Sequence, residues 1–335
     1  MRAALRALAE AATRPHDVAT LALVRDSLAH RSNHVVGRAA RAAREADLAA
    51  LAPDLVAAFS RFLEDPVRRD PGCVAKAEIV RALLSFDHTA SDVFLRGAAH
   101  VQREPAFGPP IDTAAELRAT SAMALVATGH PAALTICVAL LVDPEPAARA
   151  GGIRGLTASG RPDVALLLRL FALRGDEDPG VLAEAFAGLL TLSADDPVAF
   201  VLERLVSKDR DVARAAAMAL GEARRPEAVV ALRARLPGED RPDVRHTIIL
   251  ALATSRDDAA LDSLLDLVTH GSASDSKAAN EALRLYAHDE ALQRRLHAAL
   301  DARRPAPPPA TLRRASPPTP RSPAGRRRPK ADPLR

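Results

Sequence analysis

The chain of 335 residues has few aromatic side chains and few cysteines. It contains no Trp, one Tyr and eight Phe, so that aromatic residues make up 3% of the sequence. Its two cysteines, Cys73 and Cys137, are too few for a disulfide framework or for a cysteine-based metal cluster. We therefore expect no structural metal and no other cofactor.

Long hydrophobic runs are also missing. The longest nearly apolar stretch, residues 132–142, is about half of a membrane span. Near the N-terminus, Arg6 and Glu10 interrupt any apolar segment of the kind that a signal peptide needs. The sequence thus predicts a cytoplasmic protein with no membrane span.

Several catalytic motifs are absent as well. The chain has no glycine-rich phosphate loop, no G-x-S-x-G and no H-E-x-x-H. What it has instead is aliphatic: hydrophobic residues make up 48% of the sequence, and most of them are Ala, Leu and Val. Because Ala and Leu are strong helix formers, we expect an all-α fold.

An internal repeat organises the chain. Asp211-Val212 returns as Asp243-Val244, and Leu220 returns as Leu252, in both cases after about 32 residues. Each copy holds two apolar-periodic runs joined by a polar turn, which indicates one helix pair per repeat. Five leucines near the ends of such runs recur at the same nearly constant interval: Leu156, Leu189, Leu220, Leu252 and Leu283. This pattern predicts a right-handed α-solenoid of about eight helix pairs over residues 1–301.

A second regularity links the turns to the helices that follow them. In four repeats an acid in the turn is followed six residues later by a base: Asp70 and Lys76, Asp112 and Arg118, Asp143 and Arg149, Glu239 and Arg245. We expect each base to reach an acid of an adjacent repeat, in a ladder of buried or half-buried ion pairs that fixes the repeat register. The spacing fails at Asp178 and at Asp209.

Three repeat segments resemble HEAT repeats: A-A-R-A-G-G-I-R-G-L at 147–156, V-A-R-A-A-A-M-A-L-G at 212–221 and D-V-R-H-T-I-I-L-A-L at 243–252. They are most similar to the short bacterial form found in phycobilin lyases. The resemblance covers about residues 17–300 and implies antiparallel helix pairs with a concave, partner-binding groove. It does not imply a reaction, because one fold serves many functions. The His-Glu dipeptides of HEAT-like di-iron hydroxylases do not occur here.

One insert departs from the repeat, at residues 86–112. It concentrates three of the eight phenylalanines and ends in a Gly-Pro-Pro loop beside Phe107. If the segment were helical, Arg96, His100 and Glu104 would share one face, at i, i+4 and i+8. This triplet is a candidate acid–base or ligand site, and a solvated row of ion pairs is the simpler interpretation.

A row of arginines on the second helices is a further candidate. Arg169, Arg204 and Arg233 each stand seven residues after a turn proline. Because equivalent positions of consecutive repeats stack, the three guanidinium groups are expected to form one stripe on the concave face, suited to an acidic partner. A solvated edge, with arginine stems covering apolar neighbours, is the alternative.

The last segment, residues 302–335, has a different composition. From Asp301 onward ten side chains are basic and two are acidic, which leaves a net charge of −4 for residues 1–300 of a chain whose total is +4. The segment also holds ten of the 26 prolines, so we expect a disordered basic tail. Weak contact with nucleic acid or an anionic surface would be confined to this tail.

Together these features favour a monomeric, non-enzymatic scaffold that binds a protein partner along the concave face. The partner-binding candidates are Arg96, His100, Glu104, Phe107, Arg169, Arg204 and Arg233, with no catalytic residue among them. Two alternatives stay open at this stage. One is an enzyme or enzyme accessory built around the insert, and the other is nucleic-acid tethering through the tail.

Overall fold

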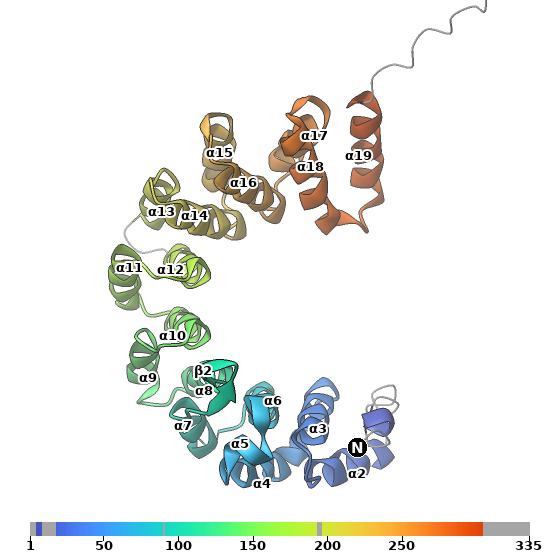
Figure 1. Cartoon of the computed structure of the whole chain (residues 1–335), viewed down its shortest axis with the longest axis vertical. Helices are drawn as coiled ribbons and strands as arrows, with labels where there is room; N and C mark the ends of the chain where they lie inside the picture. The colour runs from blue at the N-terminus through green and yellow to red at the C-terminus, as the bar shows by residue number, and fades with distance from the viewer. Residues whose placement is uncertain (1–4, 9–17, 90, 193–195, 304–335) are drawn as a thin grey trace, which may run out of the picture.

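The computed structural model describes residues 5–8, 18–89, 91–192 and 196–303. Within these ranges the helices follow one another along an open arc, and the two ends of the arc lie on the same side of a central hollow (Figure 1). Apart from one small hairpin, the described elements are all helical. The predicted all-α solenoid is therefore confirmed.

The helices form two layers (Figure 1). The inner layer lines the hollow and consists of α3 (Asn33–Glu45), α6 (Val74–Ser85), α8 (Ala115–Ala127), α10 (Pro146–Ala158), α12 (Pro179–Leu192), α14 (Arg210–Glu222), α16 (Pro242–Thr254) and α18 (Ala273–Ala282). The outer layer consists of α2 (Val18–Leu28), α4 (Ala52–Leu63), α7 (Asp92–Ala98), α9 (Ala133–Leu140), α11 (Val164–Arg174), α13 (Pro197–Leu205), α15 (Pro226–Arg235) and α17 (Asp258–His270).

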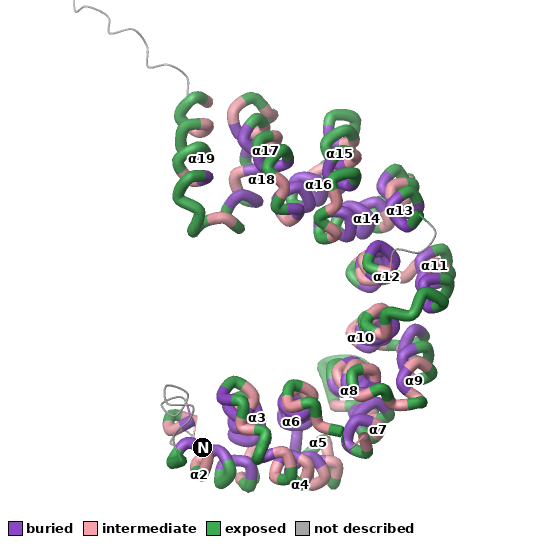
Figure 2. Tube along the Cα trace, turned by 180° about the vertical axis from the view of Figure 1, so that it is seen from behind, coloured by how far each residue is buried: buried purple, intermediate pink, exposed green. Residues whose placement is uncertain are grey.

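Each outer helix pairs with the inner helix that follows it, which gives eight pairs among the described residues. Short helical turns occur at α5 (Pro66–Arg69), η1 (Ala49–Leu51), η2 (Pro71–Cys73), η3 (Leu236–Gly238) and η4 (Leu283–Tyr286). A final helix, α19 (Glu290–Arg303), packs on α17 and closes the C-terminal end of the arc. It is mostly exposed (Figure 2), because only Leu292 and Leu296 of this helix are buried.

Local sequence signals set where the helices begin. Pro146, Pro226 and Pro242 stand in the first turn of α10, α15 and α16, where the fixed φ of proline suits the helix and its missing N–H costs no hydrogen bond. Side chains cap other helices: the carboxylate of Asp209 accepts hydrogen bonds from the backbone N–H groups of Asp211 and Val212 at the start of α14.

The core lies between the two layers and confirms the predicted repeat register. The five leucines that recur once per repeat are all buried: Leu156, Leu189, Leu220, Leu252 and Leu283. Neighbouring inner helices also approach closely. A Cβ atom at Gly151 of α10 would lie 2.2 Å from the Cβ of Ala119 in α8, so this contact requires a glycine. None of the described helices is long and apolar enough to cross a membrane.

The insert between α7 and α8 contains a hairpin that the sequence did not predict. β1 (Arg103–Ala106) pairs antiparallel with β2 (Gly108–Asp112). Gly108 has a φ of 133°, a value that favours glycine and allows the chain to reverse after Phe107. The predicted tail boundary, between residues 301 and 302, falls inside α19, and the rest of the predicted tail, residues 304–335, lies outside the described residues.

Candidate partner-binding surfaces

One edge of the solenoid holds the predicted ladder of ion pairs. Its central member is Arg118, near the start of α8, whose guanidinium group lies 2.7 Å from the carboxylate of Asp112 and 2.8 Å from that of Asp143 in the next repeat. The same group donates a hydrogen bond to the backbone carbonyl of His100. Arg118 is 3% exposed, so its charge is compensated inside the protein and is not presented to a ligand.

The ladder continues on both sides of Arg118. Lys76 and Asp70 form a completely buried pair, with Nζ 2.9 Å from the carboxylate. Arg149 binds Asp176 of the following repeat through two hydrogen bonds of 2.8 Å. One further pair, Arg245 and Asp275, has the same two-bond geometry. The predicted ladder is confirmed for Arg118, Arg149 and Arg245, which each reach an acid of the following repeat. Lys76 differs, because it binds the acid of its own turn.

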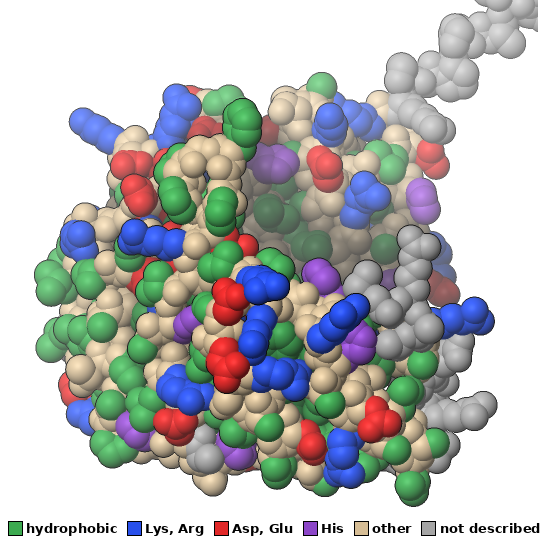
Figure 3. All heavy atoms as spheres, turned by 60° about the horizontal axis from the view of Figure 1, so that its bottom comes forward, with side chains coloured by type: hydrophobic (Ala, Val, Ile, Leu, Met, Phe, Trp, Pro, Cys, Tyr) green, Lys and Arg blue, Asp and Glu red, His purple; other side chains and the backbone are tan. Residues whose placement is uncertain are grey.

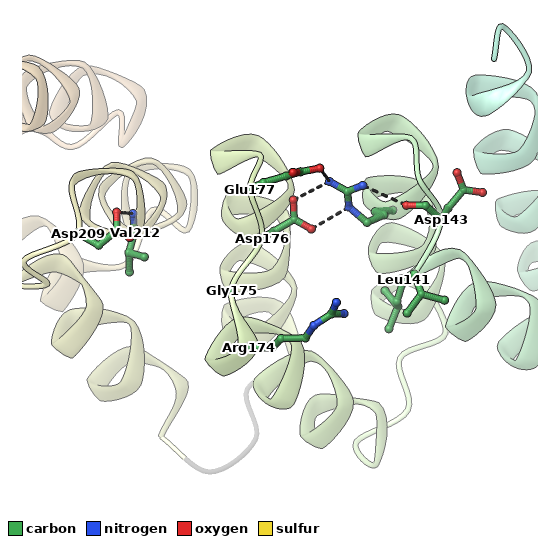
Figure 4. A pocket seen from close by; sticks show the side chains of 10 residues that line it. Leu141, Asp143, Arg174, Gly175, Asp176, Glu177, Asp209 and Val212 are labelled. Carbon is green, nitrogen blue, oxygen red and sulfur yellow. Dashed lines mark hydrogen bonds and ion pairs between the residues drawn. The ribbon is translucent and has the colours of Figure 1, made fainter. Parts of the chain in front are cut away.

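The ladder is interrupted where the spacing of acids and bases fails in the sequence. The position of Arg149, four residues after the N-cap of its helix, is occupied by Ala213 in α14, and the matching position of α12 is Leu182. Both side chains are buried and neither can form an ion pair. Beside this gap a surface cavity of about 620 Å³ opens across three successive turns (Figure 4), lined among others by Leu141, Arg149, Arg174, Asp176, Glu177 and Asp209.

The predicted triplet in the insert does not form, because α7 ends at Ala98 and the chain then enters the hairpin. Arg96 turns toward α4, where it donates a hydrogen bond of 2.8 Å to the hydroxyl of Ser60. His100 lies 3.2 Å from the side-chain oxygen of Gln102, and Glu104 accepts a hydrogen bond of 2.6 Å from the amide of the same residue. The expectation of one helical face was wrong, since it assumed that the helix continued.

Glu104 instead anchors the hairpin to the solenoid. Its carboxylate also accepts hydrogen bonds of 2.7 Å from the backbone N–H of Gly72 and from the hydroxyl of Thr113. Burial would raise the pKa of this carboxyl, but the hydrogen bonds from Thr113, Gln102 and Gly72 outweigh burial and lower it. For His100 burial is the dominant effect, and it lowers the pKa of the imidazole. Both side chains thus have structural partners at the base of the hairpin.

The tip of the hairpin is apolar and projects into solvent. Phe107 is fully exposed, at 113% of its reference area, whereas the other seven phenylalanines are buried or half-buried. Val101, which precedes β1, and Ile111 of β2 keep 55% of their area exposed. Prolines at 105, 109 and 110 lack N–H groups, which limits pairing of the hairpin edges with another strand. Of the residues predicted in the insert, Phe107 is fully exposed, Arg96 is partly exposed, and His100 and Glu104 are half-buried.

The arginine stripe was predicted on the wrong face. Arg169, Arg204 and Arg233 belong to α11, α13 and α15, and these helices form the outer layer, away from the hollow (Figure 1). The physical reason is the order of the pairs: the helix that follows each turn proline at these sites covers the convex side. Arg169 and Arg204 lie over the ring of the buried Phe200, with guanidinium carbons 4.5 Å and 5.1 Å from its centroid.

The concave face carries a different row, which the sequence analysis missed. The repeat register that aligns the buried leucines also aligns the residue two positions before each of them. On successive inner helices this position holds Arg81, Met123, Arg154, Ala187, Met218, Leu250 and Glu281. Since one side of each inner helix contacts the outer layer and its flanks contact neighbouring inner helices, exposed mid-helix side chains at this position face the hollow.

Three successive positions of this row are apolar: Ala187, Met218 and Leu250. Met218 of α14 and Leu250 of α16 keep 38% and 40% of their surface exposed. Around them lie two surface cavities. One, of about 370 Å³, is lined by Leu250, Leu285, His246 and residues of α18, and the other, of about 360 Å³, lies between α12 and α14 beside Ala187 and Glu222.

Several charges on the concave face are compensated within it. Arg154 of α10 binds Glu184 of α12 at 2.8 Å, and Glu78 of α6 binds both Arg41 of α3 and Arg81 of its own helix. Guanidinium and carboxylate groups held in such pairs keep less of their charge available for a partner. Beside these pairs, the apolar side chains of Met218 and Leu250 stay exposed on the concave face.

The described residues contain no group of three or more His, Cys, Asp or Glu side chains arranged as metal ligands. The two cysteines are buried. Burial raises the pKa of the Cys73 thiol to about 12 and that of the Cys137 thiol to about 11, so neither is an activated nucleophile.

Paired helices in two layers, with a core between them and an ion-pair ladder along one edge, define an α-solenoid. Residues 198–284 match the family model of HEAT repeats. The matched stretch begins in α13 and ends in η4. The resemblance to HEAT repeats that the sequence showed is confirmed there.

Solved structures give weaker similarities. The complex of CpcE and CpcF of phycocyanin lyase from Nostoc sp. PCC7120 is 17% identical over 68% of this chain and 89% of that chain, with a TM-score of 0.35. Human deoxyhypusine hydroxylase in complex with glycerol is 16% identical over 85% and 90%, with a TM-score of 0.28. An engineered protein is 17% identical over 83% and 94%, with a TM-score of 0.22. No curated protein sequence matches the chain at a comparable level of significance.

Proposed function

We propose that this chain is a non-enzymatic scaffold that binds a protein partner along its concave face. The observation that carries the proposal is the apolar row on the inner helices, above all Met218 and Leu250, with a surface cavity beside each of α14 and α16. Methionine side chains are flexible and polarizable, and they suit surfaces that adapt to the apolar side of a partner. The concave form of a solenoid presents such a row as an extended surface.

The partner that fits this surface is an amphipathic segment, most simply a helix. Inner helices lie about 10 Å apart, so the cavities beside α12–α14 and α16–α18 are roughly 20 Å from each other. A partner helix rises about 1.5 Å per residue, so two apolar side chains about 14 residues apart lie on one face, roughly 21 Å from each other, and would reach both cavities. The paired charges of the concave face would then lie beside the polar flanks of this helix.

The enzyme alternative has less support. Of the residues considered for a site in the insert, Arg96 binds Ser60 of α4, whereas His100 and Glu104 both contact Gln102 at the base of the hairpin. The region around Phe107 is open to solvent. Tethering to nucleic acid through residues 304–335 concerns a segment outside the described residues and stays a prediction.

Affinity purification from the native cell, followed by quantitative mass spectrometry, tests the proposal. The variant Met218→Asp/Leu250→Asp places two charges in the apolar row. Val230→Asp is the matched control, because Val230 is 63% exposed on the outer helix α15. We expect the wild type and the control to recover the same partner and the groove variant to lose it. Equal recovery by all three chains would contradict binding at the concave face.

A further inference from the structure

The convex side of the solenoid carries an apolar patch on α11. Leu166, Leu170 and Leu173 are 66%, 65% and 57% exposed, and Leu167 is 38% exposed. The opposite side of the same helix is buried in the core through Leu168 and Phe171. A helix that is hydrophobic all round is normally covered on all sides. Within the described part of the chain, the outer side of α11 is therefore an apolar surface that no other element covers.

The patch extends onto the neighbouring outer elements. Val138 of α9 is 39% exposed, and Val142 in the turn after α9 is 71% exposed. Val206, directly after α13, is 63% exposed, and it stands one repeat after Leu173, at the equivalent place of the next helix pair. In the space-filling view, hydrophobic side chains gather on the left flank, the side on which α11 lies in Figure 1 (Figure 3).

Other outer helices do not share this composition. The exposed side of α17 carries Asp258, Asp262 and Asp266, and that of α13 carries Glu203 in the place of Leu170. The leucines of α11 are thus not a general property of the outer layer. An exposed apolar patch of this extent on an otherwise polar surface marks an interaction site.

We propose that α11 is the interface of a two-fold symmetric homodimer, in which the α11 helices of two copies pack antiparallel. Leu166, Leu170 and Leu173 follow the i, i+4, i+7 spacing of a helix–helix seam. A two-fold axis near Leu170 sets Leu170 against its own copy and Leu166 against Leu173 of the other chain. Such a self-complementary arrangement is what an isologous interface requires.

The charges at the ends of α11 complement each other in the same arrangement. Asp163 stands at the N-terminal end, where it is exposed and paired with Arg161, and Arg174 stands exposed at the C-terminal end. Measured from the middle of the seam, Asp163 lies about 10 Å along the helix axis and Arg174 about 7 Å in the opposite direction. The difference of about 3 Å is within reach of an arginine side chain, so each Arg174 can approach Asp163 of the other copy.

Shape favours this pairing as well. α11 lies at the apex of the convex side of the arc (Figure 1), so two copies can meet there without contact between their ends. A stable interface buries about 800 Å² on each partner, more than one short helix supplies alone, and Val138, Val142 and Val206 extend the contact beyond α11. The dimer leaves both concave faces open. If the proposed scaffold function holds, it would bind two partners at once.

Sedimentation equilibrium of the full chain tests the proposal. We expect the wild type to have twice the 35.4 kDa mass of one chain at high concentration and to dissociate on dilution. Leu170→Glu places two carboxylates at the two-fold axis of the dimer. This variant should have the mass of one chain at every concentration, with unchanged helical circular dichroism. Leu250→Glu is the matched control, because it makes the same change at an exposed leucine of the concave face, and it should keep the double mass.

A second pair of variants tests the symmetry. Leu170→Cys should form a disulfide between two chains on mild oxidation, because residues at the axis approach their own copies, whereas Val230→Cys should not. The native thiols do not interfere, since both are buried. A wild type of single mass at all concentrations would overturn the proposal and assign the patch to a different partner. A dimer that persists in Leu170→Glu, or links equally well through Val230→Cys, would overturn it too. Partner capture by the concave face is measured separately, so the two proposals fail independently.

Discussion

Removal of the central ladder arginine should be one of the most damaging polar substitutions in this protein. In the variant Arg118→Ala, the carboxylates of Asp112 and Asp143 lose their shared counter-charge, and the carbonyl of His100 loses a donor. Breaking a buried ion pair by removing one partner costs about 3–5 kcal/mol. Arg118 bridges two repeats, so we expect a loss of unfolding free energy in the upper part of that range.

The control is an ion pair of similar geometry on the surface. Arg154 and Glu184 also lie 2.8 Å apart and join neighbouring repeats, but their side chains are 42% and 36% exposed. Water screens such a pair, so Arg154→Ala should cost about 0–1 kcal/mol. Urea unfolding followed by circular dichroism compares the two variants at constant protein concentration.

Acid should narrow the difference between Arg118→Ala and the wild type. In the wild type, burial would raise the pKa of Asp112, but hydrogen bonds from two backbone N–H groups and from Arg118 lower it. In the variant the Asp112 carboxyl loses the hydrogen bond from Arg118 that lowers its pKa, so it is protonated at a higher pH, and protonation removes its uncompensated charge. The stability deficit should therefore shrink below about pH 4. A deficit below about 1 kcal/mol at neutral pH would refute the argument that burial makes this pair important.

Three further predictions follow from the core, the ladder and the thiols. Leu220→Ala and Leu252→Ala should each lower the unfolding free energy by about 2–5 kcal/mol in urea titrations, since both side chains are fully buried, and unchanged midpoints would mean that the register is wrong. Hydrogen bonds from Arg241 hold the pKa of Glu239 at about 2, below its usual value. The ionised carboxylate therefore contributes fully to the unfolding free energy above about pH 4.5, and this contribution is lost as the pH falls toward 2. An acid titration of the unfolding free energy of Glu239→Gln should lack this loss. Cys73 should react with iodoacetamide only on unfolding, and fast labelling of the native chain would contradict its burial.

Most of the fold could be predicted from the sequence because the residues that form the core recur at the interval of the repeat. A leucine that recurs once in every repeat, such as Leu220, must occupy the same place in each helix pair. The ladder was also predictable, since a base six residues after a turn acid lies near the start of the inner helix. Arg118 shows this, and the failure of the spacing near Asp178 correctly marked the interruption of the ladder.

The candidate site was less predictable, because local spacing does not say which face of the solenoid a helix covers. Arg169 and Arg204 follow their turn prolines by the same number of residues, but both lie on helices of the outer layer. The insert was misassigned for another reason: helical spacing from Arg96 to Glu104 ignored Pro105 and the Gly-Pro-Pro stretch, which favour a hairpin over a longer helix. The concave row around Met218 could have been found by shifting the leucine register by two residues.

Photo-crosslinking of the purified complex tests the scaffold account most directly. A photoreactive amino acid replaces Met218 in one chain and Val230 in another, so that one probe faces the hollow and the other lies on the outer layer. If the partner binds along the concave face, a covalent link to it should form from position 218 and none from position 230. A link from position 230 alone would contradict binding along the concave face.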